Sequence, residues 1–183
     1  RVRWLADPCP VLMLQGTWSH EPPGTLSVFR ELGGRHAVHV ADRIGQVGLT
    51  AGGDWVVSPG WCFDELPEGL VAFFSSLPSV NRAAIAAALG AADAAGATGE
   101  HVSALLRGLA PSHAMARHLG LPTLLVSHGT VFGCTTEHGV PMAGFDHEFT
   151  TTSLFSAGAQ AFMLGHIHKH QSWDDDGRVV AYA

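Results

Sequence analysis

Three polar clusters in this sequence carry residue types suited to metal binding or acid–base chemistry, and each follows a short apolar run. An apolar run of four or five residues that ends at polar residues or glycine is typical of a buried strand. Sites in α/β folds lie at the carboxyl ends of strands, so the three clusters are predicted to converge. They are Ser19-His20-Glu21 after residues 11–15, Ser127-His128-Gly129 after residues 123–126, and Gly165-His166-Ile167-His168 after residues 161–164.

The His166-x-His168 pair is the strongest indication of a metal site. On an extended segment, residues i and i+2 point to the same side, so both imidazoles would reach into one cavity. Gly165 permits a tight backbone just before them. Imidazole suits zinc, iron, nickel and copper, and also manganese where carboxylates are present. The alternative is a pair of surface histidines that bind nothing.

The histidines of the other two clusters give weaker signals. A lone histidine is often structural, but His128 lies at a strand end before a glycine, which favours a ligand role. Glu21 could orient His20 or pair with its charge, an arrangement that suits general-acid chemistry. The alternative for Glu21 is a solvated loop residue ahead of two prolines.

The elements that must position these clusters alternate between strand and helix, which predicts an α/β fold. A turn is predicted at 174–177. The alanine-rich portion, residues 78–120, is predicted to form an ordinary amphipathic helical layer. Strands are predicted over 11–15, 36–41, 46–50, 55–57, 123–126, 161–164 and 178–183, and helices over 25–32, 81–95, 99–109, 111–119 and 150–158.

Composition excludes several classes of protein. The length predicts a single domain over residues 1–183, and a hydrophobic content of 46% excludes intrinsic disorder. A net charge of −6 argues against a broad basic face for nucleic acid, and no apolar stretch is long enough to cross a membrane. Three widely spaced cysteines without a C-x-x-C pair favour a reducing, cytoplasmic setting. Both ends of the sequence suggest excision from a longer chain.

Taken together, the three clusters resemble the last three motifs of the calcineurin-like metallophosphoesterases, commonly written G-N-H-[DE], G-H and G-H-x-H. The surrounding residues are similar to bacterial and phage DNA repair exonucleases of the SbcD type. The similarity covers nearly the whole chain. It rests on Gly16-Thr17-Trp18-Ser19-His20-Glu21, Leu77-Pro78-Ser79-Val80-Asn81-Arg82, His128-Gly129-Thr130-Val131 with Gly133, and Gly165-His166-Ile167-His168-Lys169-His170-Gln171.

The resemblance implies a four-layer α/β/β/α sandwich, incomplete at both ends, that hydrolyses phosphoesters with two divalent ions. Manganese is expected first, with iron, zinc or magnesium as alternatives. His128 and His166 would bind one metal and His168 the other. His20 would assist the departure of the leaving oxygen, with Glu21 orienting it. Ser19 stands where the family has a ligating asparagine, and a hydroxyl is the weaker ligand.

The family's carboxylate motifs, D-x-H and G-D-x-x-D, are absent ahead of residue 11, where Asp7 is the single acid. Three histidines and a serine are poor ligands for hard cations without those carboxylates. We therefore expect weak or absent metal binding by the 183-residue chain alone. The missing motifs also leave open a non-catalytic remnant that serves as a binding scaffold.

The resemblance favours phosphodiester cleavage in a DNA repair exonuclease-like protein, with a homodimer or an ATPase as partner and no membrane association. The alternative enzyme is a small-molecule phosphatase or phosphodiesterase of the same fold. His147 could line the substrate pocket, although capping of the helix at 150 by the segment 146–148 is favoured. His170 could contact a phosphate, or be an exposed polar residue.

Overall fold

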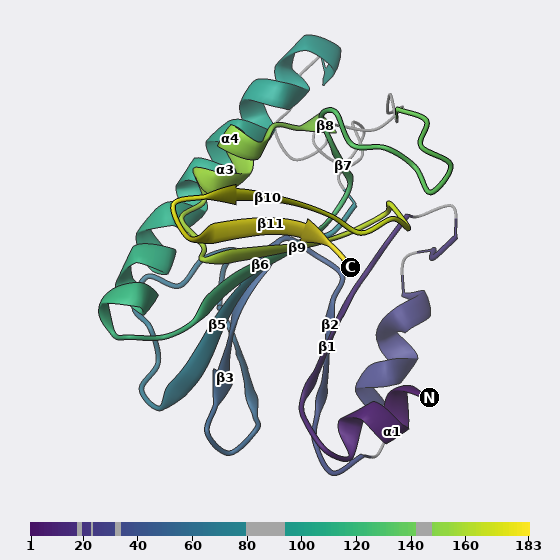
Figure 1. The fold of residues 1–183 in the computed structure, drawn as a ribbon. Helices are drawn as coiled ribbons and strands as arrows, with labels where there is room; N and C mark the ends of the chain where they lie inside the picture. Colours follow the sequence, from purple (N-terminus) through teal and green to yellow (C-terminus); the bar gives the residue numbers. More distant parts are fainter. Residues whose placement is uncertain (18–19, 23, 32–33, 80–93, 142–147) are drawn as a thin grey trace.

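A mixed β-sheet is the framework on which the candidate site is built (Figure 1). The computed structural model describes residues 1–17, 20–22, 24–31, 34–79, 94–141 and 148–183. Within them, β11, β9, β6 and β5 run parallel to one another, while β10, β3 and β4 extend the sheet by antiparallel pairing. In spatial order the seven strands are β10 (Gln171–Asp175), β11 (Arg178–Tyr182), β9 (Ala161–Gly165), β6 (Thr123–His128), β5 (Leu70–Leu77), β3 (Gly45–Thr50) and β4 (Trp55–Val57).

Two smaller strand pairs accompany this sheet, β1–β2 and β7–β8, so that the described strands form three sheets. β1 (Val11–Leu14) and β2 (Val38–Ala41) are parallel, and they lie on the side of the large sheet away from the long helix (Figure 1). The short helix α1 (Val2–Ala6) and the 3₁₀ helix η1 (Thr25–Glu31) pack against this pair through a small apolar cluster. The second pair joins β7 (Thr130–Val131) to β8 (Glu148–Phe149).

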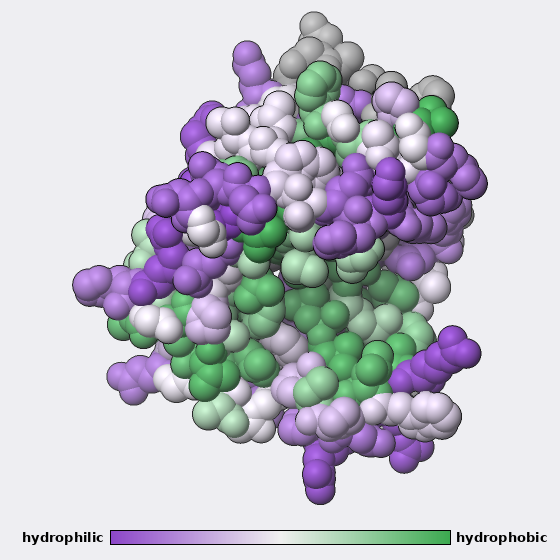
Figure 2. Space-filling model, viewed as in Figure 1, coloured by the Kyte–Doolittle hydropathy of each residue, from purple (hydrophilic) through white to green (hydrophobic). Residues whose placement is uncertain are grey.

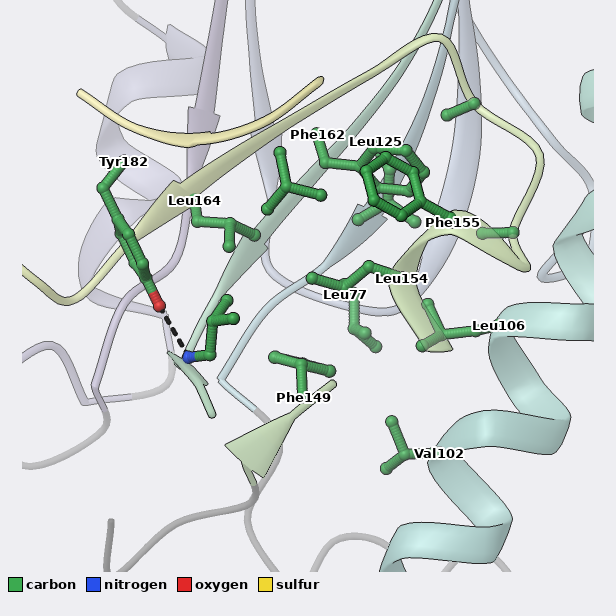
Figure 3. Packing of buried hydrophobic residues seen from close by; sticks show 14 of the residues in the cluster. Leu77, Val102, Leu106, Leu125, Phe149, Leu154, Phe155, Phe162, Leu164 and Tyr182 are labelled. Carbon is green, nitrogen blue, oxygen red and sulfur yellow. Dashed lines mark hydrogen bonds between the residues drawn. The ribbon is translucent and has the colours of Figure 1, made fainter. Parts of the chain in front are cut away.

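Helices α3 (Ala94–His118) and α4 (Thr151–Phe155) cover the other face of the large sheet, and the main core lies beneath them (Figure 3). The strands present alternate side chains to this core, as the burial of β6 shows. Burial of these apolar groups is the main stabilising term of the fold. Fully buried members of the core include Leu106, Leu125, Phe149, Leu154, Phe162 and Tyr182.

The helical portion differs from the prediction at Pro111. Two helices were expected, over 99–109 and 111–119, but α3 is one helix of 25 residues with Pro111 inside it. Proline inside a helix removes one hydrogen bond and crowds the carbonyl four residues earlier, a cost that packing on the sheet has to offset. Buried residues on both sides of it, Leu109 and His113, hold the helix on the same sheet. Neither α3 nor any other helix in the described ranges is long and apolar enough to cross a bilayer.

All seven predicted strands are confirmed, but four strands of the described residues were not predicted: β5, β10 and the short β7 and β8. β5 was not predicted, although Val71, Phe73 and Phe74 between Gly69 and Pro78 are a recognisable strand signal. β10 was missed because its sequence is polar, and the turn expected over 174–177 is confined to Asp176 and Gly177. The expected helix over 25–32 is a 3₁₀ helix, and residues 80–93 lie outside the described ranges.

Candidate functional site

Two of the predicted ligands meet where neighbouring parallel strands end. His128 is the last residue of β6 and pairs in register with Gly165, the last residue of β9. His166 follows directly. The rings of His128 and His166 lie with their centroids 5.0 Å apart and their planes at 69°. The parallel register therefore brings together two imidazoles that are far apart in the sequence.

Glycines on either side allow the imidazole of His128 to sit between two chain segments. A Cβ placed on Gly165 would lie 3.1 Å from Cδ2 of His128. A Cβ on Gly16, just after β1, would lie 3.3 Å from Nε2 of His128 and equally close to Oε2 of Glu21. Contacts this short would force the ring or the carboxylate to move. The absence of side chains at these glycines lets the loop after β1 approach the end of β6 closely.

The loop that carries Glu21 is closed by its own hydrogen bonds. The Gly16 amide donates to Oε2 of Glu21 at 2.6 Å, and the buried Gln15 side chain donates to the Glu21 carbonyl at 2.9 Å. His20 lies on the same loop and is exposed. The Glu21 carboxylate thus fixes the loop through Gly16, while its expected orientation of His20 stays a prediction.

Ser79 was not assigned a role from the sequence, yet it contacts His128. Its Oγ lies 3.1 Å from Nδ1 of His128, within hydrogen-bond distance, and both residues are half-buried. Ser79 comes directly after β5 and Pro78, so it reaches the same sheet edge as the histidines. A correct prediction of β5 would have placed this serine at the site.

The backbone at His166 is not extended, contrary to the geometry expected for the H-x-H pair. His166 has φ of +105°, a region that non-glycine residues rarely occupy. Ile167 is buried and His168 is exposed. The left-handed turn at His166 therefore breaks the alternation from which a shared direction was predicted. Strained backbone of this kind is concentrated at functional sites.

The remaining predicted residues lie elsewhere or outside the described ranges. His170 is exposed, and its Nδ1 lies 2.7 Å from the Tyr182 carbonyl oxygen, so its ring is held against β11. Ser19 and His147 lie outside the described residues. The favoured capping of the helix at 150 by segment 146–148 falls largely outside the described residues as well, and the N-cap hydrogen bond of α4 that is described runs from the Ser153 amide to the side chain of Thr150.

Tyr182 holds the loop that follows His128. Its hydroxyl donates to the Gly129 carbonyl at 2.7 Å and accepts from the Val131 amide at 2.9 Å, a bond drawn in Figure 3. Burial raises the pKa of Tyr182, so the phenol stays protonated. The last strand of the sheet therefore fixes the chain directly beyond the candidate ligand.

The described residues bring together two imidazoles that could donate to a metal ion. Among them, no group of three His, Cys, Asp or Glu side chains is arranged to hold an ion. His128 and His166 fit as two imidazole donors to one borderline metal. Asp7, the acid ahead of β1, accepts a hydrogen bond from the Arg35 amide at 3.4 Å. The remaining donors of a complete centre would have to come from other residues.

A groove of about 640 Å³ lies between β2 and the β3–β4 hairpin. Figure 2 shows apolar residues gathered in the hollow between these elements, below a hydrophilic upper part. Trp55 spans the groove, because its Nε1 donates to the Ala37 carbonyl at 3.1 Å. Burial, with a smaller contribution from the Arg30 charge, lowers the pKa of His39, whose ring lies beside Trp55.

Compared with protein-family models and with curated proteins, the chain matches none of them.

Proposed function

We propose that this chain provides the histidine-bearing part of a site that hydrolyses phosphoesters with divalent metal ions. The observation that carries the proposal is the meeting of His128 and His166 at adjacent strand ends, with Glu21 facing the same glycine. Segments far apart in the sequence bring these groups to one sheet edge, which is where α/β folds place their sites. This juxtaposition is consistent with the resemblance to calcineurin-like metallophosphoesterases.

The arrangement of layers supports the same proposal. Helices α3 and α4, the large sheet, the β1–β2 pair, and α1 with η1 follow one another in space. That order matches the four-layer α/β/β/α sandwich that the resemblance implies. We include this sandwich in the proposal, with the candidate site at the edge where β1, β6 and β9 end.

His128 and His166 would together hold one metal ion, each through a ring nitrogen. Bound divalent ions would supply polarisation of the phosphate and activation of a water molecule. We assign proton donation to the leaving oxygen to His20, which is exposed on the loop that the Gly16–Glu21 hydrogen bond closes. We propose phosphodiesters, DNA among them, as the substrate class, with small phosphoesters as the alternative.

Hydrolysis assays with manganese test this function. The protein is assayed on single-stranded DNA, duplex ends and an aryl phosphate, both as the 183-residue chain and with any coding sequence that precedes Arg1 in its gene. We expect the 183-residue chain to bind Mn²⁺ weakly, and hydrolysis to require the additional carboxylates. His166→Ala should lower the rate at least about 100-fold, since it removes a ligand rather than a peripheral contact.

An exposed histidine at the end of α3 provides the matched control. His118→Ala removes the same side chain away from the strand ends and should leave the rate unchanged. Equal rates for His166→Ala and the unmodified protein would refute the proposed site. Absence of hydrolysis from every form of the protein would instead favour a binding scaffold.

A further inference from the structure

We infer that Ser79 is a positioning residue for His128, which it holds in the tautomer that exposes Nε2 to the site. This inference rests on the proposed function, because it assigns a purpose to the orientation of one proposed ligand. Its physical basis is the 3.1 Å contact between Oγ of Ser79 and Nδ1 of His128. Which ring nitrogen of a histidine ligates a metal is set by the hydrogen bond that the other nitrogen makes.

The surroundings of the ring agree with this assignment. The Cδ2–Nε2 edge of His128 faces Gly16, and Cδ2 also faces Gly165, so this edge points to the junction of the loop after β1 with the end of β9. Ser79 approaches the opposite nitrogen from the end of β5. When Nδ1 donates to the serine oxygen, the lone pair of Nε2 is directed to the side where His166 and Glu21 lie.

Ser79 also differs in position from Ser75 and Ser76, the two serines of β5. Ser75 and Ser76 are buried within the sheet, and Ser76 donates to the Arg43 and Gly45 carbonyls. Ser79 lies past the end of the strand and is half-buried. Of these three serines, only Ser79, beyond the end of the strand, contacts His128.

Nuclear magnetic resonance of histidine-labelled protein tests this inference without a substrate. Long-range proton–nitrogen correlations at mildly alkaline pH should show His128 as the Nδ1–H tautomer in the unmodified chain. Ser79→Ala should shift the ring toward a tautomer mixture, whereas Ser79→Thr, which keeps the hydroxyl, should restore the Nδ1–H form. Ser172→Ala, at an exposed serine on β10, is the control and should change nothing.

Titration with Mn²⁺ in the same spectra extends the test to metal binding. Paramagnetic broadening of the His128 signals should require about 10-fold to 100-fold more Mn²⁺ in Ser79→Ala, the loss typical when a hydrogen-bond partner of a ligand is removed. A His128 Nε2–H tautomer in the unmodified chain, or an unchanged tautomer in Ser79→Ala, would overturn the role of Ser79. So would phosphonylation of Ser79 by a fluorophosphonate, because the hydroxyl would then be a nucleophile.

This experiment can refute the proposed metal site and the role of Ser79 independently of each other. If His128 does not broaden with Mn²⁺ in the unmodified protein or in its upstream-extended form, the metal site of the proposed function is refuted. The tautomer of His128 still decides whether Ser79 holds the ring, because it is measured without metal.

Discussion

Two serine–histidine pairs in the described part of the chain have opposite surroundings. Oγ of Ser75 lies 2.9 Å from Nε2 of His113, and Oγ of Ser79 lies 3.1 Å from Nδ1 of His128. Ser75 is within β5 and contacts a histidine of α3, whereas Ser79 follows the end of the same strand. The two pairs have the same chemistry, so the difference between them comes from their place along the sheet.

The Ser75–His113 pair under α3 is closed off from solvent. Ser75 and His113 are both fully buried, and Gln46 joins them by donating to Ser75 and to Ser112 of the helix. The His113 ring meets Phe73 edge-on at 5.1 Å between centroids. Burial, aided by the charge of Arg117, lowers the pKa of His113 to about 4, so the ring is neutral. This pair links a helix to the sheet and is inaccessible to any ligand.

The pair at the strand ends is only half-buried and borders unusual backbone. His128 lies between Gly16 and Gly165, next to His166 with its φ of +105°. Close chain approach and backbone strain are features that stability alone does not favour. Burial against the face of the sheet gives His113 a structural role, whereas His128 lies at the ends of parallel strands, where α/β folds place their sites.

The two pairs should differ most in how much their histidines contribute to the free energy of unfolding. His113→Ala should lower the free energy of unfolding by about 3 kcal/mol, because it leaves a cavity and removes the partner of a buried hydroxyl. His128→Ala should cost less than about 1 kcal/mol, because its half-buried ring can be replaced by water. Urea unfolding followed by circular dichroism measures both. Equal losses would show that the two pairs are not structurally different.

Acid should destabilise the protein through His113. Its pKa is about 4 in the folded chain against an ordinary value of 6.5, so between these values the unfolded state binds more protons. Stability is therefore complete above about pH 6.5 and is lost as the pH falls toward about 4, by roughly 3 kcal/mol from this group. Unfolding curves for the unmodified chain and for His113→Leu should diverge in this window. Parallel curves would show that His113 titrates normally.

Strands and turns that depend on a short stretch of sequence could be predicted. Apolar runs bounded by glycine gave β1, β6 and β9, and with them the strand ends that carry His128 and His166. The Asp-Gly turn before β11 was also visible, since both residues adopt positive φ in a tight hairpin. These features depend on residue type and spacing over a few positions, which a single sequence contains.

Features that depend on contacts between segments far apart in the sequence could not be predicted. The partner of His128 could not be predicted, because Ser79 becomes its neighbour only when β5 pairs with β6. The continuity of α3 through Pro111 results from packing on the sheet, which overrides the local preference of proline. The geometry of His166 was also hidden, because histidine gives no local signal for a positive φ.

The smallest expected effect on the free energy of unfolding comes from the backbone strain at His166, and the same substitutions at His113 under α3 provide the comparison. His166→Gly should raise the free energy of unfolding by about 1 kcal/mol relative to His166→Ala, because glycine adopts a φ of +105° without steric cost. The same comparison at His113, which lies inside α3, should have the opposite sign, since glycine destabilises a helix relative to alanine by about 1 kcal/mol. Urea unfolding of the four variants gives both differences. Greater stability of the alanine variant at position 166 would show that the backbone there is not strained, and the distinction between a strained strand end and a relaxed helix would be lost.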